Sequence, residues 1–173
     1  MSKFDVTESP AAVGTTGDLP LSGPALTGLL RAVLDRGKPF RFRARGASMS
    51  PSVRDGDVIT VHPPAGAPRL GDVVAHVSAE TGKLAVHRIV GRTDGGLWLI
   101  AGDGVYGEHD PALEAEILGF VTRVERNGKD VRFGLGPERR LIAVVTRRRL
   151  TRETARLLWR LLRPFYAQLR GPA

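Results

Sequence analysis

Residues 72–90 read DVVAHVSAETGKLAVHRIV. Two segments rich in β-branched residues, 72–77 and 84–90, flank a short polar stretch. Runs of this composition, bounded by polar or turn-forming residues, are typical of β-strands. Further segments of the same kind lie on both sides, most of them bounded by Gly, Pro or Asp: 40–43, 57–61, 97–100, 117–121 and 131–133. Many short strands at close spacing predict a mostly β body, either a curled antiparallel sheet or an open barrel.

Helical patterns occur only near the two ends of this β region. Apolar residues recur at helical spacing between 24 and 36, and Gly37 follows them, which predicts one short helix. A second helical pattern runs from the arginines at 147–149 to about Leu169, and Pro164 should kink or divide it. We expect four parts, which are a flexible arm (1–21), a short helix (22–38), a β domain (39–135) and a basic amphipathic helical extension (136–173).

The composition describes an ordinary globular chain. The 173 residues, 42% of them hydrophobic, are enough for one domain with its own core. The absence of Cys excludes a disulfide framework and a thiolate metal site. Neither a secretory signal peptide nor an apolar run of about 18 residues is present. We therefore expect a soluble, cytoplasmic protein, with no metal and no cofactor.

The net charge of +8 is concentrated near the C-terminal end. Between Arg147 and Arg170 there are eight Arg and one acid, Glu153, so the remaining sequence is about neutral. Three alternatives stay open for this basic amphipathic segment. It caps the β body, or it binds anionic lipid on the inner face of the membrane, or it binds nucleic acid, which is the least favoured. The sequence carries no signal for an oligomeric state.

Three polar clusters stand out against the β pattern. Ser48 lies in GASMSP (46–51), His87 lies in a predicted strand, and Asp103 and Asp110 lie in predicted loops. A Ser hydroxyl needs an adjacent base to act as a nucleophile, and an imidazole titrates in the right range. A carboxylate can fix the tautomer of that imidazole. Each cluster also has an ordinary structural explanation, as a polar turn, a half-buried histidine or turn carboxylates.

Taken together, these segments resemble the conserved boxes of type I signal peptidases. These enzymes belong to the superfamily of serine peptidases (S24/S26-like) that includes LexA-like self-cleaving repressors. The matching stretches occur in the family's order over about 40–125: 46–51 with 56–57, 70–74, 84–91, 101–103 with Asp110, and 119–121. The resemblance implies a LexA/signal-peptidase-like curled antiparallel β fold, here with a short N-terminal helix and a basic C-terminal helix.

The resemblance also implies roles for particular residues. Ser48 would be the nucleophile, and its backbone N–H would be one oxyanion donor. His87 would be the general base, at a position where most bacterial signal peptidases have Lys and the endoplasmic-reticulum and archaeal types have His. Asp110 would orient His87, with Asp103 as the second choice.

This sequence departs from the family pattern at several positions. Gly46 stands where some members have a Ser hydroxyl as a second oxyanion donor. Ser52 stands where Thr is usual, and Gly104 where Asn is usual. Residues 1–39 contain neither the transmembrane anchor of signal peptidases nor the DNA-binding domain of LexA-like repressors.

The function implied is that of a serine endopeptidase which cleaves an extended peptide, such as a signal, precursor or leader peptide. Relatives bind such a peptide by β-strand addition and take small side chains near the cut. Two alternatives stay open. One is an inactive module that binds peptides, and the other is a regulator that cleaves itself, for which Ala11-Ala12-Val13-Gly14 is a candidate segment.

Overall fold

The computed structural model describes residues 23–78, 82–104 and 109–148. The expected arm at 1–21 and most of the expected C-terminal basic helix lie outside these residues. The elements in chain order are α1 Gly23–Leu34, β1 Phe40–Arg43, β2 Val58–His62, β3 Val73–Val77, β4 Leu84–Arg92, β5 Trp98–Ala101, β6 Asp110–Ala112, the 3₁₀ turn η1 Glu114–Glu116, β7 Ile117–Arg126, β8 Lys129–Asp130 and α2 Arg139–Arg147.

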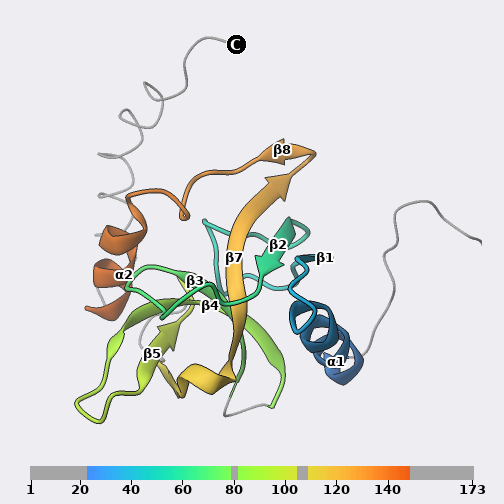
Figure 1. Ribbon diagram of the computed structural model, residues 1–173. Helices are drawn as coiled ribbons and strands as arrows, with labels where there is room; N and C mark the ends of the chain where they lie inside the picture. The colour runs from blue at the N-terminus through green and yellow to red at the C-terminus, as the bar shows by residue number, and fades with distance from the viewer. Residues whose placement is uncertain (1–22, 79–81, 105–108, 149–173) are drawn as a thin grey trace, which may run out of the picture.

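The strands form one eight-stranded antiparallel sheet in the order β1-β2-β7-β3-β4-β5-β6, with β8 paired to β7. Long β7 crosses the middle of the molecule, and α1 and α2 lie at opposite sides of the sheet (Figure 1). The pairing shifts register within β2–β7, β3–β7 and β4–β5, and such bulges bend strands and increase their twist. The expected mostly β, curled antiparallel fold is confirmed.

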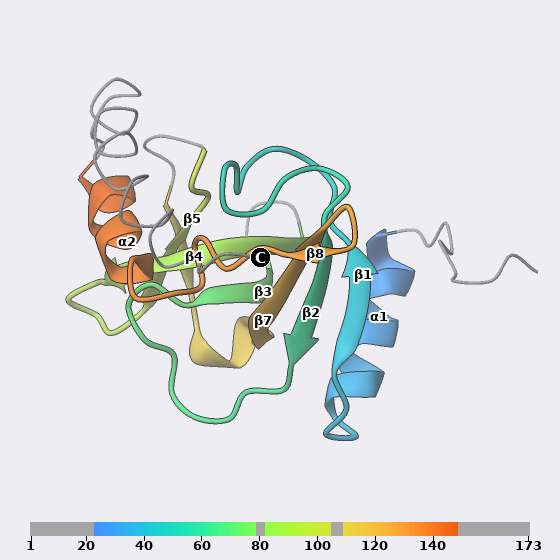
Figure 2. The ribbon, with the colours of Figure 1, turned by 90° about the horizontal axis from the view of Figure 1, so that it is seen from above.

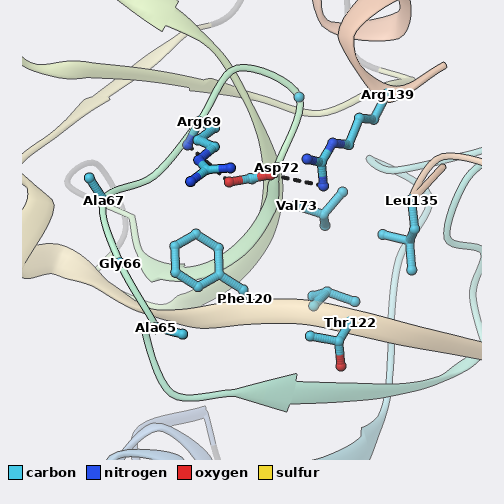
Figure 3. A pocket seen from close by; sticks show the side chains of 12 residues that line it. Ala65, Gly66, Ala67, Arg69, Asp72, Val73, Phe120, Thr122, Leu135 and Arg139 are labelled. Carbon is cyan, nitrogen blue, oxygen red and sulfur yellow. Dashed lines mark hydrogen bonds and ion pairs between the residues drawn. The ribbon is translucent and has the colours of Figure 1, made fainter. Parts of the chain in front are cut away.

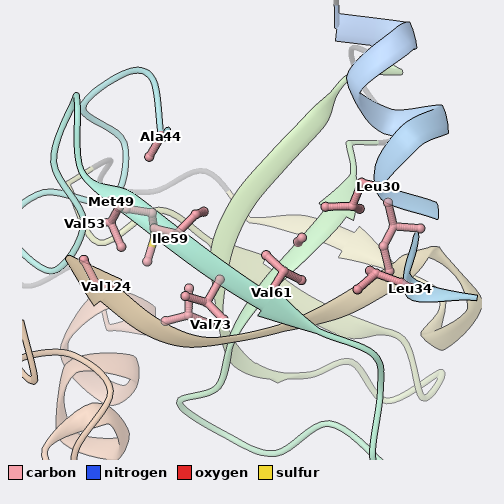
Figure 4. Packing of buried hydrophobic residues seen from close by; sticks show 12 residues of the cluster. Leu30, Leu34, Ala44, Met49, Val53, Ile59, Val61, Val73 and Val124 are labelled. Atoms are coloured by element: carbon pink, nitrogen blue, oxygen red, sulfur yellow. The ribbon is translucent and has the colours of Figure 1, made fainter. Parts of the chain in front are cut away.

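Because successive strand residues point to opposite faces, β3 supplies side chains to two separate apolar cores. Val73 and Ala75 join the larger cluster, which also contains Ile59, Val61 and Val124 (Figure 4). Val74 joins a second cluster on the other face, where it packs with residues of β4, β5, β6 and β7: Ile89, Trp98, Ile100, Ala112 and Ile117. His76 follows Val74 on this second face and is fully buried.

The first helix forms close to its expected place, at Gly23–Leu34 rather than 24–36. Leu30 and Leu34 are buried in the larger core, and α1 lies alongside β1 (Figure 2). None of the described helices is long and apolar enough to cross a membrane.

The second described helix lies within the expected extension at 136–173, but before the helical pattern that the sequence shows after 147–149. Residues 139–147 are already helical as α2, and its Ala143 is buried with Val90 of β4 and Ala101 of β5. Arg139 forms an ion pair with Asp72 at 3.2 Å beside a pocket of about 300 Å³ (Figure 3). That pocket contains neither Ser48 nor His87.

The predicted strand at 131–133 is wrong, because strand pairing is limited to β8 at Lys129–Asp130. Val131 donates one more hydrogen bond to Val124, and the chain then turns through Gly134, which has a φ of +92°. The Gly134 carbonyl accepts a hydrogen bond from the buried guanidinium of Arg88, so a tertiary contact is made at the turn. The short strand β6, which contains Pro111, was not predicted, since Pro is disfavoured in strands except at their edges.

Candidate active site

Ser48 lies in the loop between β1 and β2, which is closed on itself by hydrogen bonds. Ala44 donates to the carbonyl of Asp57, Gly56 donates to that of Ala44, and the Asp55 carboxylate accepts from the Gly46 N–H at 2.8 Å. Met49 and Val53 anchor the loop in the larger core. Ser48 itself is half-buried. The hydrogen-bonded loop therefore holds the Ser48 hydroxyl at the edge of the protein interior.

The structure brings Ser48 and His87 together. Oγ of Ser48 lies 3.2 Å from Nε2 of His87, which is within hydrogen-bond distance. Burial lowers the pKa of His87, against the opposing effect of the Asp110 and Asp103 carboxylates. A lowered pKa keeps the imidazole neutral at neutral pH, and only a neutral imidazole can accept the Ser48 proton.

The other ring nitrogen of His87 lies next to His76, which no sequence motif indicates as a site residue. Nδ1 of His87 lies 3.3 Å from Nε2 of His76, and the two ring centroids are 5.4 Å apart. In the register of β3 and β4, Val74 is opposite His87 and His76 is opposite Ala85. The two histidines are therefore diagonal neighbours on one face of the strand pair.

Neither of the two candidate carboxylates makes a hydrogen bond to His87 within the described part of the chain. Asp110, at the start of β6, acts on the site through its negative charge. That charge partly offsets the lowering of the pKa values of His76 and His87 by burial. Asp103 is turned toward Arg88, whose Nε and Nη2 bond to its two oxygens at 2.7 and 2.6 Å. The resemblance to the peptidase boxes pointed to Asp110 and Asp103 as the partners of His87. A lone histidine such as His76 matches no sequence motif that could have indicated it.

Arg88 is the centre of a buried hydrogen-bond network beside the reactive residues. Its side chain is completely buried, and all five N–H donors of its guanidinium find acceptors. Two bonds go to Asp103, one to Ser52 Oγ at 3.2 Å, and two at 2.8 Å to the carbonyls of Gly71 and Gly134. Ser52 also donates to Asp103 at 2.6 Å. Arg88 follows His87 and Ser52 belongs to the Ser48 loop, so this network fixes the two reactive residues relative to each other.

The glycines around Asp103 allow that loop to lie directly against the Ser48 loop. Gly104 donates a 2.7 Å hydrogen bond to the carbonyl of Ser48. A Cβ at Gly102 would lie 2.5 Å from that same carbonyl oxygen, and one at Gly104 would lie 3.0 Å from the carbonyl of Ala47. The close approach explains why Gly stands at position 104. From the sequence, Asp103 followed by Gly104 is also explained as an ordinary turn.

A pocket of about 300 Å³ adjoins both reactive residues. Its walls come from the end of β1, the Ser48 loop, the first half of β4 and Leu26 of α1: Leu26, Phe42, Arg43, Ala44, Arg45, Gly46, Ser48, Met49, Val53, Leu84, Ala85, Val86 and His87. The described residues contain no cluster of three or more His, Asp or Glu suited to hold a metal ion.

Comparison with known families gives one match. Residues 19–122, more than half of the chain, match the family described as Peptidase S24-like. The matched range contains Ser48, His87, Asp103 and Asp110. A comparison with curated proteins finds no match.

We expect Asp103→Asn to lower the free energy of unfolding by about 3–5 kcal/mol, because it leaves the buried Arg88 charge without its counterion. Urea unfolding measures the change. The matched control is Asp130→Asn, which removes the carboxylate from an ion pair with Arg123 whose two side chains are both more than half exposed. The control should change stability little. Equal effects of the two substitutions would contradict the role assigned to the Arg88 network.

Proposed function

This chain belongs to the Peptidase S24-like family, and on that basis we propose that it is a serine endopeptidase in which Ser48 is the nucleophile and His87 the general base. The observation that carries the proposal is the 3.2 Å contact between Ser48 Oγ and His87 Nε2 beside an open pocket. Nucleophile and base within hydrogen-bond reach, with a third group behind the base, are the usual arrangement for covalent catalysis by serine.

The proposed reaction is acyl transfer. Ser48 Oγ attacks the carbonyl carbon of the scissile bond while His87 Nε2 accepts its proton. The tetrahedral intermediate collapses, the proton passes from His87 to the leaving amine, and the peptide is left as an ester on Ser48. Water, activated by His87, then hydrolyses the ester and restores the hydroxyl. The backbone N–H of Ser48 is the oxyanion donor that we propose, and with Gly46 in place of a hydroxyl residue any second donor is a backbone group.

The substrate that we propose is an extended peptide. The first half of β4 pairs only with β3, because β5 begins its pairing at Arg88, and β1 pairs only with β2 among the described strands. The pocket lies between these two edges. A peptide strand can add its main-chain hydrogen bonds to such an edge. The apolar walls from Phe42, Met49 and Leu84 favour small or short apolar side chains near the cut.

The family match also supports a second candidate, cleavage within the chain itself. Self-cleavage is known among the LexA-like relatives, and the small residues Ala11-Ala12-Val13-Gly14 precede the nucleophile in this chain. An increase in truncated product during long incubation of the purified protein at raised pH, seen by intact mass, would show that the protein cleaves its own sequence.

We expect Ser48→Ala to abolish the new peptide N-termini that the wild-type protein produces. Purified protein is incubated alone and then with membrane and cytosolic extracts, and the N-termini are identified by mass spectrometry. Ser50→Ala is the matched control, since Ser50 lies in the same loop, and the hydrogen bonds of the described His87 ring go to Ser48 and His76 instead. If Ser48→Ala produces the same set of new termini as the wild type, the proposed peptidase is ruled out. The sequences of the termini that depend on Ser48 identify the cleavage site.

With a peptide substrate found in this way, we expect kcat/KM to fall at acidic pH with a midpoint below 6.5. The base must be neutral, and burial holds the pKa of His87 below its usual 6.5. Asp110→Asn removes a charge that favours the imidazolium, so the midpoint should move to still lower pH. Asp130→Asn, in the exposed pair with Arg123, should leave it unchanged. A midpoint that moves upward in Asp110→Asn would contradict this electrostatic account.

We also propose that the basic segment Arg147–Arg170 attaches the enzyme to anionic lipid. Support comes from its eight Arg against one acid. We expect the protein to sediment with phosphatidylglycerol vesicles at low salt and to be released as salt is raised, but not to sediment with phosphatidylcholine vesicles. Truncation after Arg148, which keeps α2, should abolish sedimentation. Undiminished sedimentation of the truncated protein would refute the proposal.

A further inference from the structure

We propose that His76 is a positioning residue for the site, and that its Nε2 accepts a hydrogen bond from His87 Nδ1–H and so holds His87 with Nε2 free to face Ser48. This inference rests on the function proposed above for Ser48 and His87. It assigns to an imidazole the place that a carboxylate has in a Ser-His-Asp site.

The geometry places His76 directly behind the base. Nε2 of His76 lies 3.3 Å from Nδ1 of His87, on the side of the ring away from Ser48. His76 is completely buried in β3, a strand paired on both sides by β4 and β7. A fully buried side chain has little freedom to change rotamer, because the protein interior is close-packed. The position of the His76 ring is therefore fixed by its packing in the sheet. Through its contact with Nδ1, His76 in turn fixes the position of the His87 ring.

The proton positions follow from the role of His87. If Nε2 of His87 accepts the Ser48 hydroxyl proton, the single proton of the neutral ring must be on Nδ1. That N–H can donate to His76 only if Nε2 of His76 is unprotonated, which puts the proton of His76 on Nδ1. Among the described residues His76 Nδ1 makes no hydrogen bond. The Val77 backbone raises the pKa of His76, which opposes the effect of burial.

Burial keeps His76 neutral and therefore able to accept a hydrogen bond. Burial and the neighbouring His87 lower the pKa of His76 to about 4, against opposing contributions from Asp110 of β6, the Val77 backbone and Glu116 of η1. His76 is thus neutral at neutral pH. When His87 becomes an imidazolium in the reaction, the neutral His76 can still accept its Nδ1–H, and the charge of Asp110 favours the imidazolium from nearby.

A neutral acceptor has a different effect from a carboxylate. A carboxylate in direct contact would favour the imidazolium strongly and raise the pKa of His87. His76 orients the ring without adding a negative charge, so burial can hold the pKa of His87 low. The arrangement suits a base that stays unprotonated in mildly acidic conditions.

The test compares His76→Leu, which removes the acceptor, with His76→Gln, whose side-chain oxygen can accept a hydrogen bond near the position of Nε2. Ring ¹H–¹⁵N correlation spectra of ¹⁵N-histidine-labelled protein report the tautomer of His87 directly and require no activity. We expect His87 to be protonated at Nδ1 in wild type and in His76→Gln, and to gain the Nε2–H tautomer in His76→Leu. The exposed His62→Gln serves as the assignment control.

A wild-type His87 protonated at Nε2, or a tautomer that is unchanged in folded His76→Leu, would overturn the inference. If His76→Leu does not fold, the wild-type and His76→Gln spectra still decide it. With a cleavable peptide, His76→Leu should lower kcat by about tenfold or more at unchanged KM, and His76→Gln should restore part of the loss. Failure of the proposed function would appear separately, as Ser48-independent termini with the His87 tautomer still as expected.

Discussion

The buried ion pair between Arg88 and Asp103 is the contact on which the site depends. A guanidinium without solvent costs several kcal/mol of desolvation unless its charge and all its donors are satisfied. Here every donor has an acceptor, and the acceptors come from the Ser48 loop, the Asp103 loop, the turn before β3 and the turn after β8. One charged group thereby holds together segments that are far apart in the sequence. Ser48 lies in a loop that bonds to Arg88 through Ser52, and His87 precedes Arg88 in β4.

The sheet separates this structural charge from the reactive imidazole. Consecutive residues of a strand point to opposite faces, so Arg88 enters the network with Asp103 while His87 faces Ser48 and His76. Burial disfavours the charged form of both histidines, and the negative charge of Asp110 partly offsets this effect by favouring the charged form. The balance leaves two neutral rings in contact, one able to accept a proton from Ser48 and one able to orient the first.

Local sequence patterns predicted most of the strands well. Segments 40–43, 57–61, 72–77, 84–90, 97–100 and 117–121 all correspond to β1, β2, β3, β4, β5 and β7, because β-branched runs bounded by turn residues need little tertiary information to specify them. The errors arise where long-range contacts override local preference. Segment 131–133 turns because Gly134 is tied to Arg88, and β6 forms despite Pro111 because β5 offers it an edge.

The sequence by itself determined the fold class, the short first helix and the residues that could carry chemistry, since these depend on composition, periodicity and the order of short motifs. Only the tertiary structure decided which groups meet. The partner of His87 Nδ1 is His76 because the register of β3 and β4 makes them diagonal neighbours. Asp103 meets Arg88 and Ser52 where Gly102 and Gly104 let its loop lie against the Ser48 loop. Register and close approach are properties of paired segments, and no single segment contains them.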